Sequence, residues 1–545
     1  MDVRALVDQY WDGFLSTEPL FATQIGDDRF DDRLPDPSEA GLAERDRLHR
    51  DALRKIEQID RSTLGFEDRT ALDAVRAMAE REIEFVRLRL DRFWAVSHML
   101  GAYWSGPGHL LAEIGQLQVA DTSDRVDRYL ARLSSVSSYF DAVAETMRGA
   151  VADQQVAPRI VVDRSIAMVE RQLSAGPEAS TALEALRDES SRDRATALLR
   201  NDAFPALARY LDALRSYREH ARDSIGLRAL PNGEEIYAAE IKGWTSLPLD
   251  PKEVHQLGVD EQAKLDEEGR TIAARHGRPD ALALVAELRA SPDLPDRQEI
   301  LEWTRQRVDR SWETSRSFFG RMPSRNCDVK PIDEFREGDM PDYYQGPSLN
   351  GSRPGVFHVN SAPRHLYSLT PTVYHEANPG HHMQMALEAE ISADRPAIRR
   401  WGAELHGAAF GEGWGLYSER LADEMGLYDD DYERVGMLEA QSLRATRLIV
   451  DTGIHALGWD RERVVRALES TGLLRGDAER ETDRYIAMPG QALCYKIGQI
   501  EIERWRAETQ GREGSAFSLR DFHDRLLAMG SLPLPTMHEE LERGA

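Results

Sequence analysis

The chain has 545 residues, of which 41% are hydrophobic, and it carries a formal net charge of −26 at pH 7. This length exceeds what one ordinary core serves, so we expect two subdomains, residues 1–234 and 235–545, that together form one continuous unit. The strong negative charge argues against nucleic acid or an anionic membrane as a partner, because both would be repelled.

The cysteines and the first residues bear on the cellular compartment. Cys327 and Cys494 lie far apart and lack the spacing of a metal-binding pair, which is typical of free or buried thiols in a reducing compartment. A signal peptide is not predicted, because the chain begins MDVRALVDQYWDGF, without a basic start or a long apolar core. No apolar run approaches the roughly 18 residues that a membrane-spanning helix needs. We therefore expect a soluble, cytoplasmic protein.

Residues 1–230 are predicted to be helical almost throughout, because apolar residues recur there at helical spacing. One such run consists of Leu72, Val75, Ala79, Ile83, Val86 and Leu90. Thr122 precedes a second run and is a candidate N-cap. Pro158, Pro205 and Pro231 mark breaks between helices.

A different pattern begins near residue 235. A helix is predicted for residues 235–244, and Asp250 followed by Pro251 favours the start of another. Residues 327–370 are rich in Gly, Pro, Ser and Tyr and are predicted to be non-helical. Within them, residues 355–360 alternate in the way a strand does.

The most informative stretch is HEANPGHH, which contains His375, Glu376, His381 and His382. Imidazole and carboxylate are ligands of catalytic zinc, which typically has three protein ligands and a water. In the usual HExxH pattern, two His four residues apart share a helix face and the Glu is the general base. Here Pro379 interrupts the helix, so we predict a bulge in which two extra residues are looped out. His381 then takes the place of the second His, and His382 is the rival ligand.

A second acidic group follows on a helix predicted over residues 405–425. Glu412 lies between two glycines, which suits close packing against the metal-binding helix, and we predict it as the third ligand. Glu419 and Glu404 are alternatives or supporting partners, since a zinc-bound His usually donates its other nitrogen to a carboxylate or carbonyl. His406 is expected to be structural.

Further candidates for the site come from other segments. Tyr485 and Tyr495 flank a Pro-Gly pair, and a phenol can donate a hydrogen bond to an oxyanion. Lys496 is a candidate contact for a substrate carboxylate. Arg353 is another, although an Arg in a Gly-Pro loop more often braces the loop. Asn360, at the end of the predicted strand, is a candidate to bind a substrate amide.

The run HEANPGHHMQ, which starts at His375, resembles the signature of a zincin-like peptidase family known as domain of unknown function 885. Similar segments are residues 350–355, 411–417, 484–498 and 522–535, so the resemblance covers nearly the whole chain. It implies a mainly α, gluzincin-type metallopeptidase fold with a small β-sheet beside the metal site, and Glu412 as the downstream ligand. It also implies that an edge strand beside the metal helix holds extended substrate by backbone pairing.

Together these residues predict a zinc-dependent hydrolase with one Zn²⁺ per chain and Glu376 as the general base. Tyr485 or Tyr495 is the group expected to stabilise the oxyanion. The resemblance favours short peptides or amino-acid conjugates as substrates. Two alternatives stay open: a metal-dependent hydrolase or lyase that acts on a non-peptide metabolite, and a helical binding protein without turnover. The sequence does not predict whether such an enzyme acts at the carboxyl end, at the amino end or internally.

Overall fold

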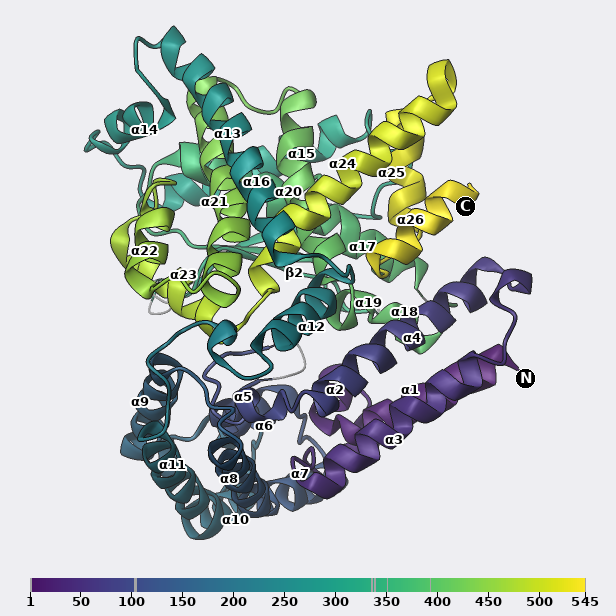
Figure 1. Cartoon of the computed structure of the whole chain (residues 1–545), viewed down its shortest axis with the longest axis vertical. Coiled ribbons are helices and arrows are strands. Elements are labelled where there is room, and N and C mark those ends of the chain that lie inside the picture. Colours follow the sequence, from purple (N-terminus) through teal and green to yellow (C-terminus); the bar gives the residue numbers. More distant parts are fainter. Residues whose placement is uncertain are drawn as a thin grey trace.

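The computed structural model describes residues 2–544 except 102–104, 335–336, 338–339, 350 and 393. Asn350, the first residue of one segment behind the family resemblance, therefore lies outside the described residues. The chain is mainly helical, with one small three-stranded sheet (Figure 1), which confirms the predicted class of secondary structure. Within the described residues, no helix combines the length and the apolar character needed to cross a bilayer.

The N-terminal helices form the lower part of Figure 1. They are α1 (Val3–Thr17), α2 (Pro19–Gln24), α3 (Glu39–Ile56), α4 (Phe66–Arg87), α5 (Asp91–Trp94), α6 (Leu110–Leu117), α7 (Ser123–Ser134), α8 (Val136–Ala152), α9 (Arg159–Ala175), α10 (Glu189–Leu198) and α11 (Phe204–Arg218). The predicted apolar face of α4 is confirmed in part. Leu72, Val75 and Ala79 are buried and Ile83 and Val86 are half-buried, but Leu90 lies beyond the end of the helix. Thr122 caps α7 as predicted, since its side chain accepts a hydrogen bond from the backbone N–H of Arg125.

The remaining helices form the upper part of the molecule. They are α12 (Gly233–Thr245), α13 (Pro251–Arg275), α14 (Ala281–Arg289), α15 (Arg297–Ser315), α16 (Leu366–Glu376), α17 (His381–Ile391), α18 (Ala397–Arg400), α19 (Gly402–Leu405), α20 (Ala408–Glu424), α21 (Asp431–His455), α22 (Arg461–Glu469), α23 (Arg475–Ala487), α24 (Cys494–Glu513), α25 (Leu519–Ala528) and α26 (Leu534–Arg543). The predicted start of α13 is confirmed, because Asp250 caps it and Pro251 occupies its first position.

The sheet contains β1 (Asp328–Pro331), β2 (Tyr343–Gln345) and β3 (Val356–Val359) in the order β1-β3-β2. β3 is the predicted strand, and it pairs with β1 in parallel and with β2 in antiparallel orientation. The expectation that this strand lies at the edge was wrong. Because β3 has a neighbour on each side, it cannot add a substrate strand by backbone pairing. The non-helical segment also ends earlier than predicted, since α16 begins at Leu366.

Buried apolar clusters cross the predicted boundary after residue 234. One cluster joins α1, α3 and α4 to Ile398 and Leu405, which lie just before α20. Another joins Val161 of α9 to buried residues of α21, α22 and α23. Shared cores of this kind hold the two halves of the chain together as packed layers.

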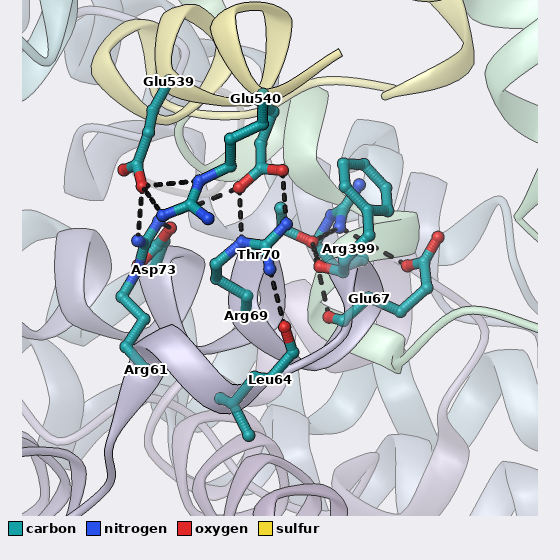
Figure 2. Close-up of polar contacts among 11 residues, drawn as sticks. Arg61, Leu64, Glu67, Arg69, Thr70, Asp73, Arg399, Glu539 and Glu540 are labelled. Atoms are coloured by element: carbon teal, nitrogen blue, oxygen red, sulfur yellow. Dashed lines mark hydrogen bonds and ion pairs between the residues drawn. The ribbon is translucent and has the colours of Figure 1, made fainter. Parts of the chain in front are cut away.

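Ion pairs also tie α4 to the C-terminal helix α26 (Figure 2). Nε and Nη2 of Arg69 donate to the two carboxylate oxygens of Glu540 at 2.6 and 2.5 Å. The Glu540 side chain is 0% exposed, so the carboxylate of this bidentate pair is fully buried. Arg61 beside it pairs with Asp73 and with Glu539, which is 39% exposed.

Candidate metal centre

The chain breaks between α16 and α17, within the HEANPGHH stretch. α16 ends at Glu376 and α17 begins at His381, so the structure has two helices where we predicted one bulged helix. Pro379 lacks the N–H that would continue α16. A Cβ at Gly380 would lie 1.9 Å from the carbonyl oxygen of His375, so only glycine fits this turn. The break still brings His381 back towards His375, as the bulge was expected to do.

His375, His381 and Glu412 form a compact cluster, in which the potential ligand atoms all lie within 4.8 Å of one another. Nε2 of His375 and Nε2 of His381 lie 3.5 and 3.7 Å from the same oxygen of Glu412. The two imidazole planes are nearly perpendicular, at 89°. Two imidazoles and one carboxylate are the donor set of a catalytic zinc site that keeps a position open for water.

One feature of the surroundings keeps space open beside the cluster. Gly415 of α20 lies against one of the two imidazoles, and a Cβ there would come within 2.6 Å of Nε2 of His375. The space in front of that nitrogen therefore depends on a residue without a side chain.

His382 lies apart from the cluster. Its Nδ1 is 2.8 Å from the hydroxyl of Tyr344 on β2, and its Nε2 is 3.0 Å from the carbonyl oxygen of Arg325. Both ring nitrogens are thus engaged, one as acceptor and one as donor. Burial lowers the pKa of His382 to about 4, so the ring is neutral at physiological pH. Of the two candidates for the second His ligand, the structure brings only His381 to Glu412.

Charges in the cluster favour a cation. Burial opposes a positive charge on His375, but the carboxylates of Glu412 and Glu419 outweigh it and raise the pKa of this imidazole to about 9. Burial likewise opposes a negative charge on Glu412, but the two imidazoles hold the pKa of this carboxyl well below its usual range. Burial raises the pKa of Glu376, whose carboxyl lies close enough to His375, His381 and Glu412 to respond to their charges.

The two candidate tyrosines have different surroundings. The Tyr495 ring stacks beside the His375 ring, with 6.4 Å between the centroids, and the residue is half-buried. Tyr485 is buried, and its hydroxyl accepts from Nε of Arg447 and donates to Glu481. The structure thus places Tyr495 beside the cluster and commits the Tyr485 hydroxyl to other residues.

The predicted substrate-binding residues also have partners within the protein. Lys496 is buried and pairs with Glu261 at 3.1 Å. Nη1 of Arg353 donates to the carbonyl of Gly346 at 2.6 Å and so braces its loop. The amide nitrogen of Asn360 donates to the carbonyls of residues 337 and 340 at 2.8 and 3.0 Å. All three side chains are thus committed to partners within the protein, and Lys496 also donates to Gln441, the residue that holds Glu419.

The sequence named two further acids as alternatives or supporting partners. Glu419 supports the cluster through its contact with Nδ1 of His375, whereas Glu404 is not part of the cluster. The structure also places three arginines around Tyr495: Arg444 and Arg447 of α21, which the sequence motifs did not indicate, and Arg484 of α23, the first residue of one segment behind the family resemblance. The signal for the first two is their spacing of three residues, which places them on one helix face.

The chain belongs to the family described as bacterial protein of unknown function (DUF885), which matches residues 19–541. Among solved structures, a "putative lipoprotein" from Colwellia psychrerythraea is 25% identical with a TM-score of 0.86, and the match covers 99% of this chain and 98% of that one. A "putative lipoprotein of unknown function" from Shewanella oneidensis is 17% identical with a TM-score of 0.81, covering 99% and 100%. No functionally curated protein matches the chain.

These comparisons contradict the predicted cytoplasmic location, because both similar structures belong to proteins described as lipoproteins. The argument from free thiols was the weak step. Cys327 and Cys494 are both buried, and burial raises the pKa of each thiol. A buried thiol of this kind is inert in an oxidising compartment as well as in a reducing one, so it does not report the location.

Proposed function

We propose that the protein is a zinc-dependent hydrolase of the zincin (gluzincin) type that cleaves amide or peptide bonds in short peptides or amino-acid conjugates. The observation that carries this proposal is the convergence of His375 and His381 on one oxygen of Glu412, with Glu376 directly beside them in the chain. This donor set matches a catalytic zinc site of the kind that leaves one position for water.

The residues around the cluster divide the chemistry between them. Zinc held by His375, His381 and Glu412 supplies Lewis-acid activation of water and of a carbonyl group. Glu376 accepts the proton that the attacking water loses and passes it to the leaving amine. The hydroxyl of Tyr495 donates a hydrogen bond to the substrate oxygen as negative charge develops on it.

A large cavity between the two halves of the chain has room for a peptide. Its volume is about 1660 Å³, and its lining includes α4, α12 and the segments 404–406 and 486–489. Sites for small molecules usually measure about 300–1,000 Å³, so this cavity exceeds what a single metabolite needs. The carbonyl oxygen of its lining residue Trp244 accepts a hydrogen bond from the thiol of Cys494, which precedes Tyr495, whereas the three members of the cluster are not among the lining residues.

The test uses zinc-loaded protein and a degenerate mixture of N-acetylated hexapeptides, with products identified by mass spectrometry. We expect the wild type to cleave members of the mixture and Glu376→Gln to be slower by about a hundredfold or more, the usual contribution of a general base. The variant should keep its zinc and its melting temperature, because Gln preserves the shape of the side chain. Unchanged turnover in Glu376→Gln, or no cleavage by the zinc-loaded wild type, would contradict the proposal.

A further inference from the structure

Three arginines lie around Tyr495, the residue that stacks beside the His375 ring. The guanidinium carbon of Arg447 lies 4.6 Å from the centre of the Tyr495 ring, and that of Arg444 lies 5.8 Å from it. Arg484 stacks on the neighbouring Tyr485 at 5.2 Å. One face of α21 and one turn of α23 therefore place positive charge around Tyr495.

This arginine cluster, formed by Arg444, Arg447 and Arg484, has more positive charge than its protein partners balance. Glu481 is the one carboxylate that the described residues place in ion pairs with it, and it accepts from Arg447 and Arg484 at 3.0 Å each. Arg444 donates to a backbone carbonyl, that of Ala440. Burying a charge without a partner costs free energy. The net charge of the whole chain is −26, so this local excess of positive charge runs against the overall composition.

Each of the three guanidinium groups also keeps a buried N–H without a hydrogen-bond partner among the described residues. These are Nε of Arg444, Nη1 of Arg447 and Nε of Arg484. The cluster is nevertheless not closed off, since Arg444, Arg484 and Tyr495 are half-buried. Buried donors without partners and excess positive charge beside a half-buried tyrosine are features that suit an anionic ligand.

We propose that the arginine cluster binds the free C-terminal carboxylate of a peptide substrate, so that the enzyme removes residues from the carboxyl end. This inference rests on the proposed peptide hydrolysis. Arg444 has the fewest partners within the protein and is the main contact, whereas Arg447 is held by Tyr485 and Glu481 and adds charge behind it. The amino end of a peptide carries a positive charge, which the same cluster would repel.

The distances around Tyr495 indicate how many residues are released from the carboxyl end in one cleavage. The centre of the Tyr495 ring lies 6.4 Å from the His375 ring and 5.8 Å from the guanidinium of Arg444, the main contact. An extended peptide covers about 3.3–3.6 Å per residue. A carboxylate held by the arginine cluster thus leaves room for roughly one to three residues between it and the scissile bond.

The experiment compares two versions of the degenerate N-acetylated hexapeptide mixture, one with free carboxyl ends and one with C-terminal amides. We expect the zinc-loaded wild type to cleave the free acids about ten- to a hundredfold faster, the range given by hydrogen bonds to a charged group, and to release fragments of one to three residues. Arg444→Gln should reduce this ratio towards one. Arg434→Gln, at the start of the same helix and paired with Asp423, should keep it.

The outcomes separate this inference from the proposed function. Equal cleavage of acids and amides by the wild type would overturn the carboxylate site and leave peptide hydrolysis intact. Should neither mixture be cleaved, calorimetric titration of the zinc-loaded wild type with the same two mixtures decides the matter. If the acids bind more tightly than the amides, and Arg444→Gln abolishes this difference, the carboxylate site is supported without any cleavage. Equal binding of acids and amides overturns it.

Discussion

Nδ1 of His375 lies 2.9 Å from a carboxylate oxygen of Glu419, and both side chains are buried. Because a carboxylate only accepts, this contact holds a proton on Nδ1, so that in the neutral ring Nε2 is the nitrogen free to bind a metal ion beside Glu412. The other oxygen of Glu419 accepts from the amide of Gln441 at 3.1 Å, so the carboxylate is itself held in place. Glu419 therefore sets both the orientation and the tautomer of the imidazole.

The first prediction concerns this supporting carboxylate. Glu419→Gln should weaken zinc binding by about 10–100-fold, because an amide no longer stabilises the ring proton as a carboxylate does. Competition with a chromogenic chelator measures the change. Glu424→Gln, on the same helix but in a more exposed pair with Arg506, is the matched control and should bind zinc as the wild type does. Equal affinity in the two variants would show that Glu419 does not support the site.

The second prediction concerns the close approach of α20 to the metal cluster. Gly415→Ala adds a Cβ within 2.6 Å of Nε2 of His375, so we expect zinc binding to weaken by about 1–3 kcal/mol, the usual cost of overpacking. The same chelator competition measures it. At Gly411, on the same helix, a Cβ would meet its nearest neighbour at 3.7 Å, which is ordinary contact. Gly411→Ala should therefore bind zinc normally, and a loss as large as that in Gly415→Ala would contradict the steric argument.

The third prediction concerns the joint between α4 and α26 (Figure 2). Glu540→Ala leaves the guanidinium of Arg69 without its buried partner, so we expect a loss of about 3–5 kcal/mol in the free energy of unfolding. Glu539→Ala breaks the neighbouring, more exposed pair with Arg61 and should lower the free energy of unfolding by at most about 1 kcal/mol. Urea unfolding of both variants tests the contrast. Similar losses in the two would mean that burial of Glu540 adds nothing.

The fourth prediction concerns the pH dependence of stability. Asp451 is fully buried, and burial raises the pKa of its carboxyl to about 7, although it accepts from the hydroxyl of Tyr237 and the N–H of Gly490. Between about pH 4 and 7 the folded protein keeps a proton that the unfolded chain has released, so stability falls as the pH rises through this window. Asp451→Asn removes this titration.

We expect the free energy of unfolding of the wild type to fall by about 2–4 kcal/mol relative to Asp451→Asn between these pH values. Unfolding in urea at the two ends of the window measures the difference. The exposed Asp193→Asn serves as the control and should run parallel to the wild type. A difference between wild type and Asp451→Asn that stays constant with pH would rule out this carboxyl as the titrating group.

Much of the fold follows from local patterns in the sequence. Helical periodicity predicts α4, and the residues Thr122 and Asp250 predict where α7 and α13 begin. The central position of β3 does not follow, because its partners β1 and β2 are only four and three residues long and carry no alternating pattern of their own. Which strand lies at an edge depends on pairing between distant segments, which a local pattern does not encode.

The candidate site shows the same division. The HEANPGHH motif and the glycines around Glu412 predict the three members of the cluster. The choice between His381 and His382 is made by Tyr344 and Arg325, which come from distant segments. Long-range contacts likewise commit Lys496 to Glu261 and gather the arginine cluster around Tyr495.

The most direct test of the metal centre is elemental analysis of the purified protein after addition of zinc and removal of the excess, comparing the wild type with His381→Ala and His382→Ala. We predict about one zinc per chain in the wild type, as a three-ligand catalytic site holds. His381→Ala should lose this zinc, and His382→Ala should keep it. A wild type without zinc, or a loss confined to His382→Ala, would contradict the assignment of His375, His381 and Glu412 as the metal ligands.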